Sequence, residues 1–539
     1  MRVLFFSPFA GIWRHTILEN QLIQALSTSD EIEIYSVGCG GLFPDDCTVR
    51  DYFRGREENT LQKSIEGCNK CKNARVLFET NTRAKTIKLT DYTNSHQESL
   101  VEEFVSKTQN SNLEYINFQG IEVGRMALYE IILKYKKRTT KLSEHEFSQW
   151  KSIVRNEALA IFPALEILKT VKPDAVITYN AQDGIPGTFA QLSLKLGIRT
   201  FTITGSSSPV EAATAVKIWN WGTYKAEGPS TIEWRGENPK FSLVKRDRMR
   251  LMRHEKYTYT GKSPWTYSNG RTGQNPYEFF GISKQNKIVL AVLNSEDEIF
   301  AAKVARVFSD LRTESTVFTS QSEWVKFLIK EFLNKTDIHL VIRLHPREFP
   351  NKREGQLSEQ AEAWAKLLDS LPSNVHLDHP NLGFSLYDYF PYIQTLTTGW
   401  SSAAIEALLH GIPVVTYDRN LLGYPADEIV TGTSKEEYSA NIALSVSMAR
   451  DTKRVVFAKR WIVFSHFRGA IYLGGGLQDA HLRAFNPLFS LFLRFLNRSL
   501  NKIVPRQIKK IDLVVPRSKK DDRKIVDLIV GKKDNLHQL

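Results

Sequence analysis

Residues 395–418, TLTTGWSSAAIEALLHGIPVVTYD, place a short helical pattern between two apolar runs that read as strands. Serine is common at helix starts because its hydroxyl accepts hydrogen bonds from unpaired backbone N–H groups, and glycine after a helix supplies the left-handed terminal turn. Ser401 and Ser402 therefore predict a helix start, and Gly411 predicts its end. A strand–loop–helix–strand unit of this kind is typical of an α/β domain with a parallel sheet.

The two adjacent serines follow Gly399 and a tryptophan, which is more than a helix start requires. A helix N-terminus attracts anions through its free N–H groups and its dipole. Either the serines only cap the helix, or the loop also binds a phosphate group.

A second polar loop follows the apolar run IHLVIRL, where His345 and Pro346 come directly after the strand pattern. Proline stops a strand ladder and directs the chain outward. His345 can donate to a phosphate oxygen there, and Arg343 and Arg347 can add bidentate hydrogen bonds. The alternative is an ordinary turn.

The chain has two regions in which strand and helix patterns alternate, one before and one after an irregular passage. Its 539 residues are too many for one hydrophobic core. We therefore predict two doubly wound, Rossmann-like α/β domains whose ligands lie at the carboxyl ends of the strands. Neither a GxGxxG fingerprint nor a P-loop is present, which argues against dinucleotide dehydrogenases and P-loop NTPases. The predicted parts are an N-terminal domain (1–256) with a cysteine-containing loop insertion (39–75), a linker (257–282), a C-terminal domain (283–485) and a basic tail (486–539).

RLHP at 343–346 and GWSSAAIEALLHGIPVV at 399–415 resemble the nucleotide-binding half of GT-B glycosyltransferases of the capsule and surface polysaccharide biosynthesis type. These enzymes share His-Pro and Ser-Ser motifs with bacterial CMP-sialic acid and CMP-Kdo transferases. The resemblance is specific over residues 285–420 and general elsewhere. It implies two domains facing a cleft, with a nucleotide-sugar donor on the C-terminal domain.

The resemblance also implies roles for single residues. His345 and the Ser401–Ser402 pair would contact the donor phosphate, and Glu406 would contact the nucleotide ribose. The alternative for Glu406 is a carboxylate that is favourable in a first helical turn. Fixed donors stabilise the charge that builds on a departing phosphate, and no DxD motif follows a convincing strand. We therefore expect no catalytic cofactor.

The acceptor needs a general base, which we expect from the N-terminal domain. Asp183 lies in the loop after VITYN and, with Gly184, faintly resembles the acidic-acidic-Gly motif of the sialyltransferases, although Gln182 stands where the first acid would be. The alternative is an aspartate in a turn. The other residues predicted on the acceptor side or near the cleft are His15, Glu19, Asn180, Glu211 and Asn294.

All four cysteines lie close together in the sequence, at Cys39, Cys47, Cys68 and Cys71. A CxxC pair with two further cysteines can form a tetrahedral thiolate site, for which structural zinc is the usual occupant. The alternatives are reduced, unligated thiols and a disulfide or redox role.

The formal charge of +13 is concentrated in the tail, where 13 Lys or Arg stand against 5 Asp. Arg494, Arg498 and Lys502 recur every four residues among Leu and Phe, which suits an anionic membrane surface. The alternative is a last helix packed on the body of the protein. No basic-aromatic platform accompanies the charge, which argues against nucleic acid.

The apolar start of the chain contains a proline and lacks a clear signal-peptide cleavage site, and no run reaches the roughly 18 apolar residues of a membrane span. We therefore expect a cytoplasmic protein, at most attached to the inner face of a membrane. The leading function is transfer of a sugar from a nucleotide-sugar to a surface glycan or its lipid-linked precursor. The alternatives are polyol-phosphate transfer from a CDP-glycerol-type donor and a non-catalytic subunit of a polysaccharide assembly complex.

Overall fold

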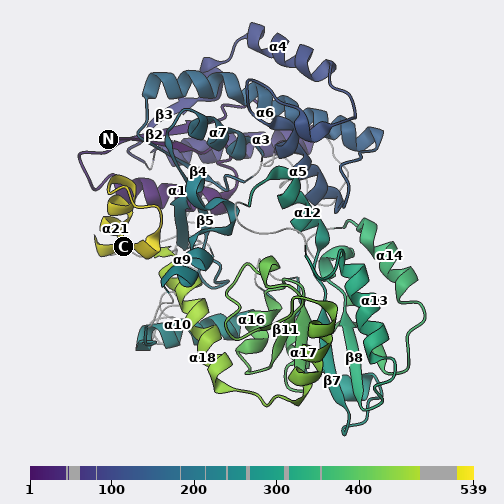
Figure 1. Cartoon of the computed structure of the whole chain (residues 1–539). Coiled ribbons are helices and arrows are strands. Elements are labelled where there is room, and N and C mark those ends of the chain that lie inside the picture. Colours follow the sequence, from purple (N-terminus) through teal and green to yellow (C-terminus); the bar gives the residue numbers. More distant parts are fainter. Residues whose placement is uncertain are drawn as a thin grey trace.

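The chain folds into two α/β domains, which lie one above the other in Figure 1. The computed structural model describes residues 1–43, 47, 61–80, 82–182, 184–212, 214–237, 241–262, 267–308, 315–351, 355–473 and 519–538. Each domain contains one sheet with helices on both faces. The predicted fold class of two Rossmann-like domains is therefore confirmed.

The N-terminal sheet has the order β13-β6-β5-β4-β1-β2-β3. The first five strands of the chain are parallel, whereas β6 runs antiparallel to β5 and β13 runs antiparallel to β6. Its strands are β1 (Arg2–Phe6), β2 (Glu33–Gly38), β3 (Lys85–Lys88), β4 (Ala175–Tyr179), β5 (Arg199–Gly205), β6 (Ala215–Asn220) and β13 (Ile471–Tyr472).

The C-terminal sheet has the order β12-β11-β10-β7-β8-β9, with every pair parallel. Chain order reverses between β1 and β4 in one sheet and between β7 and β10 in the other, and such reversals are where doubly wound folds bind ligands. Its strands are β7 (Lys287–Val292), β8 (Ile338–Arg343), β9 (Val375–Asp378), β10 (Thr395–Thr398), β11 (Val414–Thr416) and β12 (Val430–Thr431).

Strand β1 shows why the central strands are apolar throughout rather than alternating. Val3 and Phe5 belong to one buried cluster, whereas Leu4 and Phe6 belong to another. Successive side chains of a strand point to opposite faces, and here helices cover both faces. The apolar run at the start of the chain is therefore a core strand, as the sequence predicted.

The helices of the N-terminal domain include α5 and α6, which reach the domain interface at their connecting loop. Ser143 and Glu146 form a capping box that fixes the start of α6, and Lys136, with φ of 51°, ends α5. The helices are α1 (Trp13–Leu26), α3 (Leu61–Thr80), α4 (Ser95–Ser106), α5 (Val123–Tyr135), α6 (Glu144–Val171), α7 (Gly184–Lys195), α8 (Trp221–Tyr224), α9 (Pro229–Glu237) and α10 (Lys245–Thr258), with 3-10 turns η1 (Leu89–Tyr92), η2 (Leu113–Tyr115) and η3 (Lys225–Glu227).

The C-terminal domain is joined to α10 through the predicted linker, whose described part contains α11 (Pro276–Phe279) and is held by hydrogen bonds from Thr272 to the carboxylate of Asp388. Its other helices are α12 (Glu296–Ala305), α13 (Gln321–Phe332), α14 (Glu359–Leu367), α15 (Leu386–Tyr389), α16 (Ala403–Leu408), α17 (Lys435–Ser447) and α18 (Thr452–Ile462), with the short turns η4 (Pro346–Glu348), η5 (Pro380–Leu382) and η6 (Arg419–Leu421).

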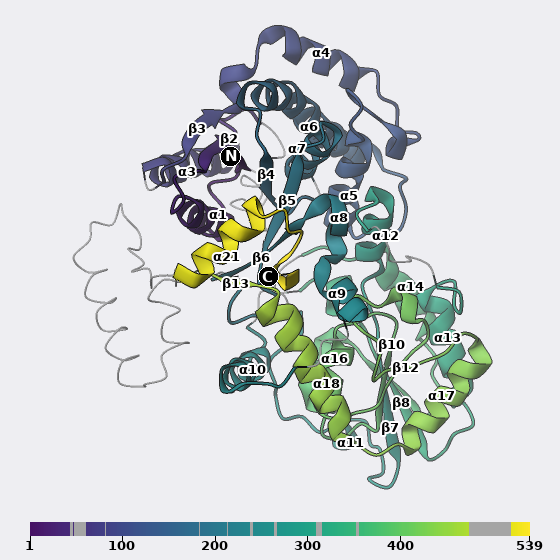
Figure 2. The ribbon, with the colours of Figure 1, turned by 60° about the vertical axis from the view of Figure 1, so that its left-hand side comes forward.

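After α18, the chain returns to the N-terminal domain through a π-helix, η7 (Val463–Arg468). Strand β13 then pairs with β6, and α21 (Lys519–Val530), which is followed by the turn η8 (Leu536–Gln538), packs on α1, as Figure 2 shows. The sequence analysis assigned η7 and β13 to the C-terminal domain (283–485) and the residues of α21 to the basic tail (486–539). The structure differs because α21 buries its apolar face, Ile525, Leu528 and Ile529, in the N-terminal core.

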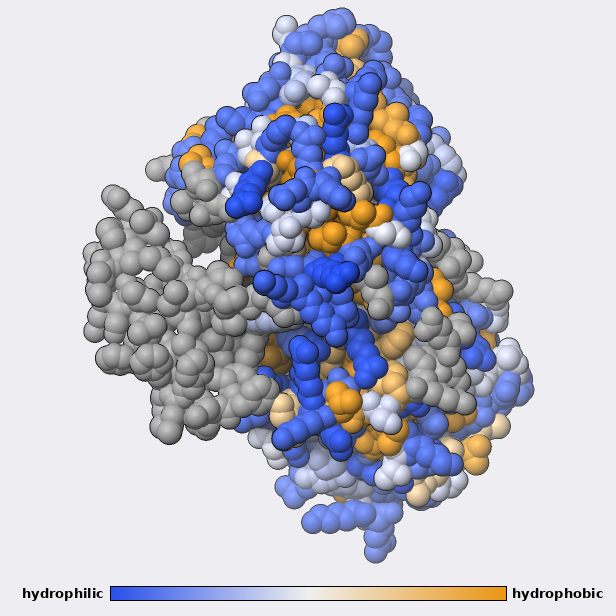
Figure 3. All heavy atoms as spheres, turned by 90° about the vertical axis from the view of Figure 1, so that its left-hand side faces the viewer, coloured by the Kyte–Doolittle hydropathy of each residue, from blue (hydrophilic) through white to orange (hydrophobic). Residues whose placement is uncertain are grey.

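The membrane prediction rests on residues that the structure does not cover. Arg494, Arg498 and Lys502 lie outside the described residues. Among the helices that are described, none is long and apolar enough to cross a membrane. On the face shown in Figure 3, the described residues are mainly hydrophilic, with separate hydrophobic patches over both domains.

Candidate functional site

A cavity of about 900 Å³ lies between the two domains and is lined by residues of both. Its size is that of a small-molecule or cofactor site. The N-terminal wall comes from α1, the ends of β4 and β5, and β6, and the C-terminal wall comes from the segments that follow β7, β8 and β10. The sequence-predicted residues that line it are His15, Asn180, Arg343, His345, Ser402 and Glu406.

The two serines before α16 have different surroundings. The hydroxyl of Ser401 accepts from the N–H of Ala403 at 3.3 Å, and its carbonyl accepts from the Tyr424 hydroxyl at 2.8 Å. Ser402 has helical backbone angles, makes no side-chain capping bond, and lines the cavity. Capping therefore uses Ser401 and leaves Ser402 at the cavity wall.

His345 begins the turn η4 at the end of β8 and lines the cavity. Its Nδ1 accepts from the N–H of Arg347 at 3.3 Å, and Tyr267 packs edge-on against its ring. Burial, with the nearby cations Arg347, Arg343 and Lys136, lowers the pKa of His345 to about 3. A neutral ring that accepts at Nδ1 carries its proton on Nε2, so His345 is a hydrogen-bond donor rather than an acid at neutral pH.

Glu406 lies one turn into α16 and lines the same cavity. Its Oε2 is buried and has no hydrogen-bond partner. Burial raises the pKa of Glu406 to about 7, while a hydrogen bond with Tyr387 lowers it. An unsatisfied buried acceptor costs free energy, so this oxygen suits a ligand that brings a donor.

The two predicted arginines are both engaged in ion pairs. Arg343 lines the cavity, but its guanidinium pairs with Asp378 and donates to the carbonyl of Phe384 at 3.1 Å. Arg347 is outside the cavity lining and pairs with Asp297 at 2.8 Å. Neither guanidinium therefore has the free bidentate face that we expected for phosphate.

Two other predicted residues on the C-terminal side, Gly399 after β10 and Asn294 after β7, are not among the residues that line the cavity. A Cβ at Gly399 would lie 2.7 Å from the hydroxyl of Tyr417, so glycine is required there by packing. Asn294 is buried, its N–H donates to Gln321 Oε1 at 2.7 Å, and its amide reaches Thr398 at 3.4 Å. These contacts hold the ends of β7 and β10 together.

On the N-terminal wall, His15 stacks on Tyr179 with ring centroids 3.7 Å apart. Asn180 follows β4 with φ of 53°, a left-handed conformation that asparagine adopts more readily than most residues. Such conformations concentrate at functional sites. The wall thus combines an aromatic stack with a strained turn at the carboxyl end of the sheet.

Three acids of the N-terminal domain were predicted on the acceptor side or near the cleft, and the structure describes two of them, Glu19 and Glu211. Asp183 lies outside the described residues. Glu19 is buried, and burial raises its pKa to about 7, against opposing contributions from Ser7 and Arg75. Glu211 forms an ion pair with Arg250. Neither Glu19 nor Glu211 is among the residues that line the cavity.

None of the four cysteines, all of which are described, forms a disulfide. The insertion that we predicted as a loop contains the helix α3, which carries Cys68 and Cys71. Burial raises the pKa of Cys39 and Cys71 to about 11, which disfavours thiolates. Among the described residues, all four cysteines included, no group of three or more metal-binding side chains could hold an ion. Structural zinc stays a prediction from the sequence.

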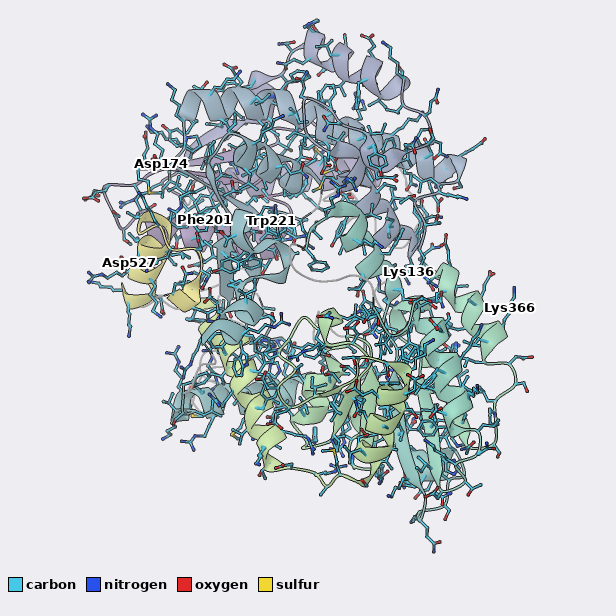
Figure 4. All side chains as sticks on the ribbon, viewed as in Figure 1. Lys136, Asp174, Phe201, Trp221, Lys366 and Asp527 are labelled. Atoms are coloured by element: carbon cyan, nitrogen blue, oxygen red, sulfur yellow. The ribbon has the colours of Figure 1, made fainter. Side chains whose placement is uncertain are left out.

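The sequence analysis missed a group of N-terminal and returning residues that line the cavity. Lys217 and Trp219 lie on β6, Trp221 begins α8, and His254 and His466 come from α10 and η7. Figure 4 labels Trp221 on the N-terminal side of the space between the domains. The aromatic cluster IWNW at 218–221 was the only sequence signal, and core packing explains such a cluster equally well.

No family model matches the chain, and no curated protein sequence matches it. Among solved structures, Staphylococcus aureus MnaA with UDP is 11% identical, covers 95% of this chain and 99% of its own, and has a TM-score of 0.29. Thermosulfurimonas dismutans KpsC, described as a β-Kdo 2,4 transferase, is 13% identical over 57% of this chain and 88% of its own, with a TM-score of 0.34. Neisseria meningitidis UDP-GlcNAc 2-epimerase is 11% identical, covers 86% of this chain and 99% of its own, and has a TM-score of 0.25. These similarities are too low to assign an activity, and the fold assignment follows from strand order alone.

Proposed function

We propose that this protein is a GT-B glycosyltransferase that transfers a sugar from a nucleotide-sugar donor to a surface or capsular glycan or its lipid-linked precursor. The observation that carries the proposal is the unpartnered Oε2 of Glu406 in the interdomain cavity. A ribose diol has two hydroxyl donors, and a carboxylate is an acceptor for both. A buried acceptor without a partner also favours ligands that can satisfy it over those that cannot.

The donor phosphates are assigned to the adjacent part of the C-terminal wall. The Nε2–H of His345 and the hydroxyl of Ser402 are two donors that line the cavity with Glu406. Negative charge grows on the phosphate as the glycosyl bond breaks, and donors that are fixed before the reaction stabilise that charge without reorganising. In this proposal no metal ion is needed for the leaving group.

The acceptor is assigned to the N-terminal wall, across the cavity from Glu406. It must lose a proton from its attacking hydroxyl to a general base. His15 lines this wall, and Asp183 stays the base predicted from the sequence. Separate His15→Gln and Asp183→Asn variants distinguish them, because loss of the base lowers kcat while nucleotide binding is retained.

The first test is a thermal-shift panel of CMP, CDP, UDP, GDP, their sugar nucleotides and CDP-glycerol on the full chain, since a ligand that binds only the folded state raises the melting temperature. Glu406→Gln should bind weakly and lose most of the shift. The matched control is Glu348→Gln: burial also raises the pKa of Glu348 to about 7, but Glu348 lies outside the cavity lining. A sugar nucleotide that binds and is turned over supports transfer, CDP-glycerol turnover favours polyol-phosphate transfer, and binding without turnover supports a non-catalytic subunit. An unchanged shift in Glu406→Gln would overturn the assignment.

A further inference from the structure

Lys217 is a half-buried cation on the N-terminal wall of the cavity. It lies on β6, and its Nζ donates to the hydroxyl of Ser207 at 2.7 Å. Within the part of the chain that the structure describes, Lys217 forms no ion pair. Burial alone lowers its pKa to about 8. This half-buried cation therefore has a hydroxyl partner but no counter-charge among the described residues, and charges withdrawn from water are usually paired.

The charged residues of the cavity wall also suit the binding of an anion. Among the described lining residues, the charged side chains are Lys217, Arg343 and Glu406. Arg343 is neutralised by Asp378, and Glu406 lies on the opposite domain. The N-terminal wall is therefore positive where Lys217 reaches it.

Two acids of the neighbouring segments are already paired with other cations. Glu211 pairs with Arg250, and Asp247 pairs with Arg468 at 3.1 Å. His254 and His466, whose ring centroids are 5.5 Å apart, line the cavity as well. The nearby Lys217 adds to burial in lowering the pKa of His466, so the two groups share one electrostatic environment. An incoming anion would relieve this excess of positive charge.

An aromatic side chain, Trp219, lies beside the cation and keeps 7% of its surface exposed. Trp219 follows Lys217 by two residues on β6, so both side chains point to the same face of the sheet. The indole N–H of Trp219 donates to the carbonyl of Lys225 at 2.8 Å, which fixes the ring at the cavity wall. A rigid aromatic ring next to a cation suits a sugar that carries a negative charge.

We propose that Lys217 and Ser207 bind an anionic group, a carboxylate or a phosphate, of the acceptor, whose sugar ring packs near Trp219. This inference rests on the proposed function, because it assigns the acceptor to the wall opposite the donor. The anion has two sources, a sugar acid within a glycan or the phosphate of a lipid carrier. Both bring the same charge to Lys217.

The test is calorimetric titration of the full chain with inorganic pyrophosphate and with glucuronate, each in the presence of the nucleotide that stabilises the protein most. The nucleotide occupies the donor side, so the added anion reports on the N-terminal wall. Lys217→Met should weaken anion binding by about tenfold or more, because a charge-assisted hydrogen bond is lost. Lys217→Arg, which keeps the charge, should restore most of it, and Lys169→Met, an exposed lysine of α6, should change nothing.

Tighter binding of pyrophosphate would support a phosphate-bearing acceptor, and tighter binding of glucuronate would support a sugar-acid acceptor. The titration is repeated on His345→Ala and in the absence of nucleotide. Anion binding at Lys217 is then measured independently of whether the C-terminal wall binds a nucleotide-sugar. Anion binding that persists in His345→Ala and is lost in Lys217→Met would support this site even if no nucleotide binds. Equal binding by wild type and Lys217→Met, or no binding of either anion, would overturn it.

Discussion

Lys136 of the N-terminal domain donates to the carbonyl oxygen of Arg347 in the C-terminal domain, and Arg347 donates back to the carbonyl of Leu133 at 2.9 Å. Lys136 is buried and also donates to the carbonyl of Gln356 at 2.5 Å. Figure 4 labels Lys136 beside α14, where the two domains meet. Since Arg347 is two residues after His345, this exchange ties the turn that carries His345 to the N-terminal domain.

Arg347→Ala should destabilise the protein rather than act only on ligand binding. The substitution leaves Asp297 as a buried acid without its cation, a loss of about 3–5 kcal/mol in the free energy of unfolding for a pair of this kind. Denaturant unfolding measures it. The comparison is His345→Ala, which should lower kcat about 100-fold with little change in stability. Equal stability of the two variants would contradict the structural role of Arg347.

Ser401→Ala and Ser402→Ala should separate stability from activity. Ser401 makes the capping bond, so its loss should cost about 1 kcal/mol of stability and leave turnover nearly intact. Ser402 lines the cavity without capping, so its loss should lower kcat with an unchanged melting temperature. Thermal melting and steady-state kinetics on both variants check this, and the opposite pattern would show that the two roles are exchanged.

Strand patterns and loop positions were predictable because they depend on local chemistry. The apolar runs at β1, β7 and β8 are continuous since both faces of each sheet are covered, and their alternation with helical patterns predicts a doubly wound fold. His345, Ser402 and Glu406 follow strand ends of one sheet, so their convergence on a cavity follows from parallel topology.

Side-chain partners were not predictable, because they come from distant parts of the chain. Arg347 looked like a phosphate ligand beside His345, but Asp297, 50 residues away, pairs with it. Lys217 had no motif around it, and the residues that share its cavity wall come from α10 and the returning segment η7. The return of the chain into the N-terminal sheet uses a strand of two residues, too short to leave a pattern.

The end of the chain gives a stability prediction. Leu528 of α21 is fully buried in the N-terminal core, so Leu528→Ala should lower the free energy of unfolding by about 2–5 kcal/mol. The control is Val530→Ala on the same helix, where the side chain is exposed and little change is expected. Similar stability of Leu528→Ala and wild type in urea unfolding would mean that α21 is not part of this core in solution.

Nucleotide binding should depend on pH through Glu406. Its pKa is about 7 in the free protein, and a carboxylate that accepts from two hydroxyls must be ionised. Affinity should therefore fall as pH drops below 7, by up to about tenfold per unit, because binding then requires release of a proton. Calorimetry at pH 5.5, 6.5 and 8 measures this slope, and Glu406→Gln should bind weakly with no slope.

The same group has the opposite effect on stability. Burial raises the pKa of Glu406 from 4.5, so the folded state holds its proton more tightly than the unfolded state does. Its contribution to stability is thus greatest at acid pH and declines as pH rises from about 4.5 through 7. Glu406→Gln should therefore melt higher than wild type at pH 8 and close to it at pH 4.5. Glu348→Gln should show the same gain in stability while keeping wild-type nucleotide affinity, and a loss of affinity there would mean that the two carboxyls are not independent.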